Sequence, residues 1–291
     1  MDSPPEAGRV YCSRYELSRE LGRGSMGVVF LAYDLQFQRK VALKFLHESS
    51  FDEEGYSRFV EEARVLSKLR HRNILPLYDY DLGGDCPFLV FLYIEGQDLA
   101  EVIRANRGKG AARDAKTLSR WMLSLCDAMK EAHGQGIFHR DIKPSNVLID
   151  KDDELLLSDF GIAKSGDRAK KLTRSGYVLG TPLYIAPEIL AGAEASERSD
   201  IYSAGVTFYE LLEGRAPFDR SSRAAPMRVS SRKVARVVEK SMAKTPEHRY
   251  GSFGELQEAL KDASRHDHEG DEVIARIIHD MHDICRRLSL L

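Results

Sequence analysis

The chain opens with a region whose apolar residues follow the spacing of β-strands. Short apolar or alternating blocks, separated by turn residues, lie at residues 15–17, 28–33, 40–46, 75–80 and 88–94. Between Phe59 and Leu69 the apolar residues recur every three or four positions instead, which predicts a helix. The pattern therefore predicts a small sheet that carries one helix.

Beyond Gly96 the spacing of the apolar residues becomes helical. Helix-like stretches lie at residues 98–106, 117–134, 200–213, 232–243 and 253–263. We therefore place a boundary near Gly96 and expect an α+β fold, in which a sheet-rich lobe precedes a larger helical lobe. Residues 1–12 are predicted to form a flexible leader, and the basic stretch at 220–232 to form a loop.

A separate amphipathic pattern occupies residues 271–291. Its apolar residues form one stripe at helical spacing: Val273, Ile274, Ile277, Ile278, Met281, Ile284, Cys285 and Leu288. We predict a helix that either packs on the preceding domain or binds a partner or a second copy of the chain. Four histidines lie in or near it with neighbouring aspartates, and we interpret them as a solvated turn and helix face rather than a metal site: His266, His268, His279 and His282.

Composition narrows the class of protein. The hydrophobic fraction is 43%, which is enough to fill a core, and the formal net charge is −2, which argues against a general nucleic-acid binder. The longest apolar run, at 88–94, is too short to span a bilayer, and the N-terminus lacks the features of a signal peptide. The four cysteines form no CxxC pair, which indicates free thiols, so we expect a cytoplasmic location.

Two polar stretches far apart in the chain give the strongest chemical signal. The first is residues 139–146, His-Arg-Asp-Ile-Lys-Pro-Ser-Asn, and the second is Asp159-Phe160-Gly161. Together they offer carboxylates, a lysine and an amide, which can position a hydroxyl, a phosphate and a metal ion. Two nearby carboxylates are also typical of glycosidases, but the intervening Lys143 and Asn146 fit phosphate and metal better.

A glycine-rich turn precedes the second strand block. The spacing GxGxxG, which dinucleotide-binding folds also use, comes from Gly22, Arg23, Gly24, Ser25, Met26 and Gly27. In those folds a helix begins at the third glycine, whereas here a strand begins at Val28. On the next strand, Lys44 should project to the same side as Ala42, under the turn.

From about Tyr15 to Leu260 these motifs resemble the protein kinase family, and they look most similar to its bacterial eukaryotic-like (Hanks-type) serine/threonine members. The resemblance implies a two-lobed kinase domain at 13–263, with an antiparallel sheet lobe and one main helix at 13–95. A mostly helical lobe would follow at 96–263, and the amphipathic extension at 264–291. It also implies transfer of the γ-phosphate of ATP, with Mg²⁺, to serine or threonine hydroxyls of protein substrates.

The resemblance assigns catalytic roles to individual residues. Asp141 would accept or orient the proton of the incoming hydroxyl, and Lys143 would lie beside the transferred phosphate. Asn146 and Asp159 would hold magnesium through oxygen atoms. Thr181 would contact the catalytic aspartate and lysine, and a threonine at this position is typical of the serine/threonine-directed class.

The resemblance also outlines a nucleotide site. Lys44, held by Glu62, would neutralise phosphate oxygens beneath the glycine-rich turn and Val28. The register of the family favours Glu62 over the adjacent Glu61 as the partner of Lys44. Phe91 would lie at the back of the pocket, and Leu92 and Ile94 would bind adenine through their backbone. Four apolar side chains would enclose the adenine ring: Leu21, Val29, Ala42 and Leu148. A spine that joins the two lobes would consist of Leu66, Leu77, His139 and Phe160.

Other motifs are assigned structural or regulatory roles by the resemblance. Glu188 should pair with Arg249, and Asp200 should hold the catalytic loop. Thr173 and Ser175 match the spacing of a doubly phosphorylated loop in bacterial kinases, with Arg140 as the partner of the phosphate; the alternative is an ordinary polar loop.

Three features depart from the family pattern. Leu92 stands where an acidic residue is usual, the chain after Phe218 is shorter than usual, and the C-terminal extension has no family role. The main alternative is a pseudokinase scaffold that binds ATP without turnover, although Lys44, Asp141 and Asp159 are all present. A kinase of small molecules is a second alternative, and the Ala186-Pro187-Glu188 element with its expected arginine partner argues against it.

Overall fold

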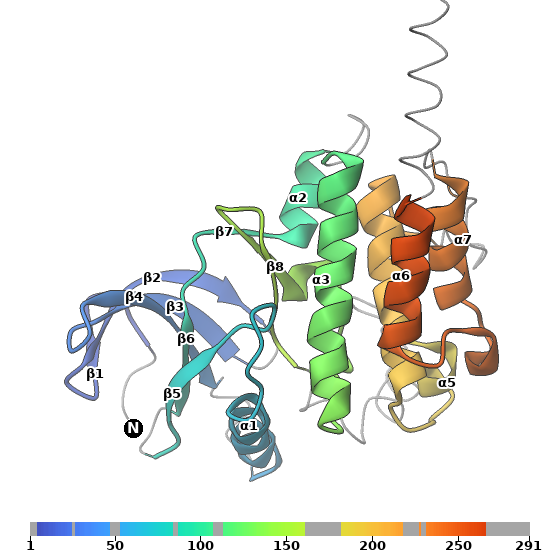
Figure 1. Ribbon diagram of the computed structural model, residues 1–291. Helices are drawn as coiled ribbons and strands as arrows, with labels where there is room; N and C mark the ends of the chain where they lie inside the picture. The colour runs from blue at the N-terminus through green and yellow to red at the C-terminus, as the bar shows by residue number, and fades with distance from the viewer. Residues whose placement is uncertain are drawn as a thin grey trace, which may run out of the picture.

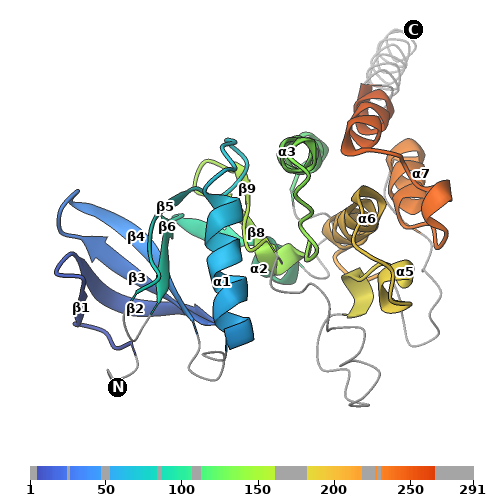
Figure 2. The same cartoon turned by 90° about the horizontal axis from the view of Figure 1, so that it is seen from below.

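The computed structural model describes residues 5–24, 27–46, 53–83, 87–106, 113–160, 182–217, 227 and 231–265. Within these residues the chain forms two lobes, one built on an antiparallel sheet and the other on helices (Figure 1). This arrangement confirms the predicted α+β fold and the change of character near Gly96. In Figure 2 the helix α1, Glu53–Leu66, stands between the sheet and the helical lobe.

The first lobe is a six-stranded sheet in the order β1-β2-β3-β4-β6-β5, with every neighbouring pair antiparallel. The bounds are Val10–Tyr11 for β1, Tyr15–Arg23 for β2, Gly27–Asp34 for β3, Arg39–Leu46 for β4, Leu77–Asp81 for β5 and Phe88–Leu92 for β6. Every predicted strand block is therefore confirmed, although β2 extends well beyond the predicted 15–17.

The prediction that residues 1–12 form a flexible leader is wrong for the part next to the sheet. Val10 and Tyr11 form β1, which pairs with Glu16 and Tyr15 of β2. The ring of Tyr11 packs on the rings of Phe45 and Phe88, with centroids 4.9 and 6.3 Å away. This aromatic burial orders a segment too short to show a strand pattern of its own.

The helix α1 begins earlier and ends earlier than the predicted 59–69. Its first turn, from Glu53, is polar, so the apolar spacing becomes visible only at Phe59, where the helix first faces the core. Leu69 is still buried but lies in the turn after Leu66, where it extends the apolar spacing beyond the helix. The spacing of the apolar residues alone therefore misplaced both ends of the helix.

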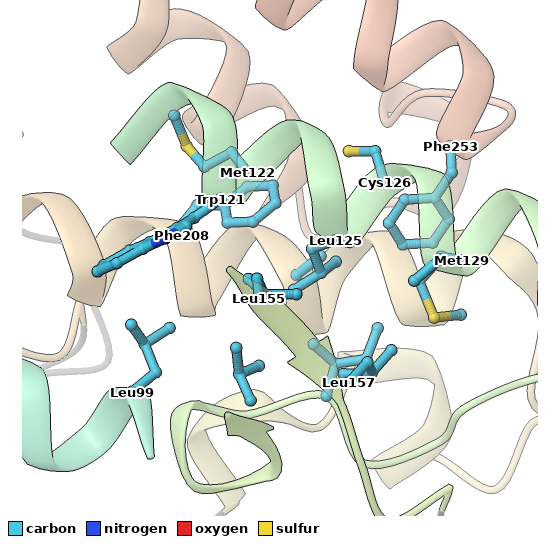
Figure 3. Packing of buried hydrophobic residues seen from close by; sticks show 14 of the residues in the cluster. Leu99, Trp121, Met122, Leu125, Cys126, Met129, Leu155, Leu157, Phe208 and Phe253 are labelled. Carbon is cyan, nitrogen blue, oxygen red and sulfur yellow. The ribbon is translucent and has the colours of Figure 1, made fainter. Parts of the chain in front are cut away.

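The second lobe is mostly helical. Its helices are α2 at Leu99–Ala105, α3 at Ala115–Gly134, α5 at Pro187–Leu190, α6 at Glu197–Glu213, α7 at Arg232–Ser241 and a last helix at 253–265. The core lies where α3 meets α6 and the last helix, and Figure 3 shows Trp121 near Phe208, and Phe253 near Cys126 and Met129. Within the described residues, no helix is both long and apolar enough to cross a membrane.

A second, three-stranded sheet was not predicted. It consists of β7 at Gly96–Asp98, β8 at Val147–Asp150 and β9 at Leu155–Leu157. The polar stretch at 139–146 ends where β8 begins, and Asp159 follows β9 by two residues. Because β8 and β9 pair with each other, this small sheet brings the two polar stretches of the sequence together.

Replacement of Gly27 by alanine is expected to lower the free energy of unfolding by about 1–3 kcal/mol. A Cβ atom at Gly27 would lie 2.0 Å from the backbone oxygen of Phe45, so β3 and β4 would have to separate. Gly22→Ala is the matched control from the same turn, because a Cβ atom there meets nothing within 4 Å. Urea denaturation measures both variants, and an equal loss in the two would contradict this steric explanation.

Candidate active site

Lys44 is the centre of a charged cluster between the lobes. Its Nζ lies 2.6 Å from Glu62 Oε1 on α1 and 2.8 Å from Asp159 Oδ1 after β9. The side chain of Glu62 is 2% exposed, whereas that of Asp159 is 51% exposed. Glu61 instead faces solvent and pairs with Arg64. The preference for Glu62 over Glu61 as the partner of Lys44 is therefore confirmed.

The cluster keeps Lys44 and Asp159 charged. Burial alone would lower the pKa of Lys44, but the carboxylates of Asp159 and Glu62 outweigh it and raise the pKa. The positive charge of Lys44 lowers the pKa of Asp159, against the effect of burial. Glu62 differs, because its own burial raises its pKa more than Lys44 lowers it. An ionised, half-exposed carboxylate at Asp159 is a donor suited to a hard cation such as Mg²⁺.

Asp141 is the centre of a second polar cluster, within the stretch 139–146. Lys143 Nζ lies 2.8 Å from Asp141 Oδ2, and the amide nitrogen of Asn146 donates to the same oxygen at 3.0 Å. The Asn146 amide also donates to the backbone oxygen of Asp141 at 2.9 Å. With its nitrogen committed to Asp141, Asn146 has its amide oxygen as the atom that can serve a metal ion.

The two clusters are adjacent, because the backbone N–H of Ser158, next to Asp159, donates to the backbone oxygen of Asn146 at 2.9 Å. Lys143 and His139 both act electrostatically on Asp159, in the direction that favours its ionised form. His139 also packs on Phe160, with ring centroids 4.5 Å apart, and its Nε2 lies 3.0 Å from the backbone oxygen of Ser158. The predicted contact between His139 and Phe160 is therefore confirmed.

Asp200 holds the backbone of the catalytic loop, residues 139–146, as predicted. Its two carboxylate oxygens accept the backbone N–H groups of His139 at 2.8 Å and Arg140 at 2.9 Å. Arg140 has φ of 65° and Asp159 has φ of 51°, a conformation that costs free energy in residues other than glycine. A buried carboxylate with two N–H donors is one of the few arrangements that can hold such a loop.

The sheet lobe aligns the side chains that were assigned to the nucleotide. Across the strands, Val29 lies opposite Gly22 and Lys44, and Ala42 lies opposite Phe91. Ala42 and Phe91 are buried, Val29 is partly buried and Leu21 is 36% exposed. The backbone N–H of Leu92 donates to the carbonyl of Pro76, so this N–H is not free for adenine. Leu148 lies on β8 of the small sheet, opposite Leu156.

Comparison with known proteins identifies the family. The protein kinase domain matches residues 15–287 of this chain. The chain belongs to the protein kinase family. Its fold agrees with this, because the kinase domain of Mycobacterium tuberculosis PknI superposes with a TM-score of 0.71 at 28% sequence identity, over 90% of this chain and 100% of that chain.

Bacterial serine/threonine kinases are among the relatives of this kinase domain. The chain is 34% identical over 272 residues to the serine/threonine-protein kinase Pkn1 of Myxococcus xanthus, and 35% identical over 272 residues to PrkC of Bacillus subtilis. These matches cover 87% and 88% of this chain. They cover only 38% and 41% of the relatives, so the chain spans less than half of their length.

The kinase domain also contains the predicted pair between Glu188 and Arg249. The guanidinium group donates to both carboxylate oxygens of Glu188, at 2.6 and 2.8 Å. Several assigned residues lie outside the described residues: Ser25, Met26, Thr173, Ser175 and Thr181, together with most of 218–230 and all of 266–291. Among the described cysteines, Cys12 and Cys126 are free thiols as predicted.

Sequence reasoning missed His133, at the end of α3. Its Nε2 lies 2.9 Å from Asp200 and its Nδ1 3.2 Å from Glu197, so the imidazole joins two carboxylates of α6. The rings of Phe138 and Phe253 pack against it, with centroids 5.2 and 5.3 Å away. Burial alone would lower the pKa of His133, but the carboxylates of Asp200 and Glu197 outweigh it and raise the pKa above its ordinary value. A lone histidine on a helix gives no sequence signal for this role.

A second missed pair lies beside the segment that contains Glu188. The hydroxyl of Tyr184 donates to the carboxylate of Glu210 on α6, and the backbone oxygen of Tyr184 accepts from the hydroxyl of Ser203 at 2.7 Å. Burial, followed by the bond to Glu210, raises the pKa of Tyr184. These bonds fix the end of this segment on α6, which was not apparent from residue spacing.

Replacement of His133 by glutamine is expected to lower the free energy of unfolding at pH 6 by about 1.5–3 kcal/mol, the range for hydrogen bonds to charged groups. Because folding raises the pKa of His133, its stabilisation is complete below its ordinary value near 6.5 and is lost as the pH rises through the raised pKa. The difference between wild type and variant should therefore shrink between pH 6 and pH 9.

Chemical denaturation of both proteins at a series of pH values measures this difference. His248→Gln is the matched control, because His248 is exposed and its replacement should change stability by less than about 0.5 kcal/mol. A difference for His133→Gln that stays constant with pH would mean that the positive charge of the imidazolium does not stabilise the contacts with Asp200 and Glu197.

Proposed function

We propose that this chain transfers the γ-phosphate of ATP to serine or threonine hydroxyls of proteins. The observation that carries the proposal is that the two clusters meet at Asp159. Its carboxylate forms an ion pair with Lys44 of the sheet lobe, and the positive charge of Lys143 in the helical lobe favours its ionised form. Two cations and an ionised carboxylate at one place suit a phosphate and its metal ion. The names of Pkn1 and PrkC, both serine/threonine-protein kinases, support the substrate class.

In this proposal each residue has one task. Lys44, held by Glu62, binds phosphate oxygens, and Lys143 neutralises charge on the transferred group. Asp141 orients the substrate hydroxyl and accepts its proton. The oxygens of Asp159 and Asn146 would hold Mg²⁺, which supplies charge neutralisation when it is bound with ATP. The catalysis by these side chains is then mainly positioning and electrostatic stabilisation.

The binding of adenine is part of the same proposal. Val29, Ala42 and Leu148 would enclose the ring, with Phe91 behind it and with hydrogen bonds from the backbone of Leu92 and Ile94. Since the N–H of Leu92 is bonded to Pro76, the carbonyl of Leu92 and the backbone of Ile94 would serve adenine. Three points stay predictions: the bounds 13–263 of the catalytic domain, the role of Thr181 and a cytoplasmic location. The binding of a partner or of a second copy of the chain through residues 271–291 stays an alternative for that segment.

The test incubates the full chain with labelled ATP and Mg²⁺, alone and with a generic basic protein as acceptor. Label on serine or threonine is the expected result, and Lys44→Met should lose it. Lys40→Met is the matched control, because Lys40 lies on the same strand and pairs with Glu95 in solvent. ATP binding without transfer, seen as a thermal shift in the unlabelled sample, would instead support the pseudokinase alternative.

A further inference from the structure

A groove outside the active site lies between the end of α1, the loop that follows it and β5. It encloses about 490 Å³, which is large enough for several apolar side chains. Its apolar lining includes Leu66, Leu69, Ile74 and Leu77, and its edge includes Tyr78 and Tyr80, which are 39% and 52% exposed. None of the charged residues of the two active-site clusters lines it. The groove therefore offers an apolar surface that the proposed chemistry does not use.

One edge of the groove is basic. Arg70 lines it, and Lys68 and Arg72 lie beside it in the same loop. All three side chains are exposed, and among the described residues no carboxylate forms an ion pair with any of them. Three neighbouring positive charges beside an apolar surface favour an occupant that is both acidic and apolar.

The last part of this chain has both properties, in a matching order. An acidic run comes first, formed by Asp267, Glu269, Asp271 and Glu272. The apolar stripe of the predicted helix follows directly, from Val273 to Leu288. These residues lie outside the described residues.

The described chain ends within reach of the groove. The hydroxyl of Ser264 lies 3.3 Å from that of Ser119, near the start of α3. Two hydrogen bonds connect this part of α3 with the loop that lines the groove: Trp121 Nε1 donates to the backbone oxygen of Asp153 at 2.7 Å, and Asn73 Nδ2 donates to the backbone oxygen of Leu155 at 2.7 Å. Residues 266–272 can span up to about 23 Å when extended, which is enough to return along α3 to the basic edge. The acidic run would then reach the basic edge before the stripe reaches the apolar lining.

We propose that residues 266–291 fold back along α3 and dock on this groove of the same chain. The acidic run contacts the basic edge, and the stripe of the predicted helix covers the apolar lining and the two tyrosines. The docked segment packs against the end of α1, which is the helix that carries Glu62. Docking therefore stabilises α1 in the position that pairs Glu62 with Lys44. The docking itself does not depend on phosphoryl transfer, so it can be tested independently of the proposed function.

Hydrogen–deuterium exchange of the full chain, followed by mass spectrometry, tests the docking. In the wild type, amides of 273–288 should exchange at least about tenfold more slowly than in an unstructured chain. Ile277→Asp places a charge in the stripe, so protection should fall both at 273–288 and at 66–80. Ala275→Asp is the matched control, because residue 275 lies on the opposite face of the predicted helix and the variant should keep the wild-type protection.

A second variant tests the groove from its other side. Reversal of charge by Arg70→Glu with Arg72→Glu should lower protection at 273–288, although both substitutions are far along the chain from it. The proposal would be overturned if the wild type showed no protection at 273–288. It would also be overturned if Ile277→Asp changed the protection at 273–288 but left that at 66–80 unchanged. Protection that falls on tenfold dilution of the protein would also overturn it, because the occupant would then be a second copy.

Discussion

Replacement of Asp141 by asparagine is expected to lower kcat for phosphoryl transfer by about 10²–10⁴-fold, the usual contribution of a general base. The Asp141 carboxylate is fixed by Lys143 at 2.8 Å and by the amide of Asn146 at 3.0 Å, so the asparagine can occupy the same place. An amide oxygen cannot take up the proton of a hydroxyl at neutral pH. Lys44 and Asp159 are unchanged in the variant, so the KM for ATP should change little.

Steady-state assays with a protein acceptor measure both constants. Asp152→Asn is the matched control, because Asp152 forms a similar 2.8 Å pair with Lys151 but both side chains are exposed, 67% and 68%. This control should keep the wild-type kcat. A kcat for Asp141→Asn within tenfold of wild type would show that another group accepts the proton, and the proposed role of Asp141 would have to be withdrawn.

The sheet could be predicted because it depends on local spacing, whereas its ion pair came from the family resemblance. Alternation along β4 puts Ala42 and Lys44 on one side, and the observed register places them opposite Leu31 and Val29 of β3. The resemblance, and not the spacing, selected Glu62 rather than Glu61 as the partner of Lys44. The structure agrees with this choice, because Glu62 lies on the buried face of α1 and Glu61 does not.

Features that depend on distant contacts could not be predicted. The strands β7, β8 and β9 have three or four residues each, which is too short for a periodic pattern, and they form because they pair with one another. Tyr11 is ordered only by rings from other strands, which residue spacing does not reveal. The same holds for His133, whose role depends on Asp200 and Glu197 of α6.

Replacement of Arg249 by methionine is expected to lower the free energy of unfolding by about 3–5 kcal/mol, the usual cost of breaking a buried ion pair. The Arg249 side chain is fully buried and that of Glu188 is 17% exposed, so the variant leaves a carboxylate without its partner. Arg249 also donates to three backbone oxygens, at distances from 2.7 to 3.1 Å, in Ala243, Arg198 and Lys244. Methionine fills the volume but satisfies none of these acceptors.

Urea denaturation of a double-mutant cycle separates the two parts of this cost. Addition of Glu188→Leu to Arg249→Met should recover part of the lost stability, because no charge is then left unpaired. Recovery should be incomplete, since the three backbone oxygens still lack their donor. Arg232→Met, on the exposed face of α7, is the matched control and should change stability by less than about 0.5 kcal/mol. If Arg249→Met behaved like this control, the pair would not hold the segment of Glu188 on the helical lobe.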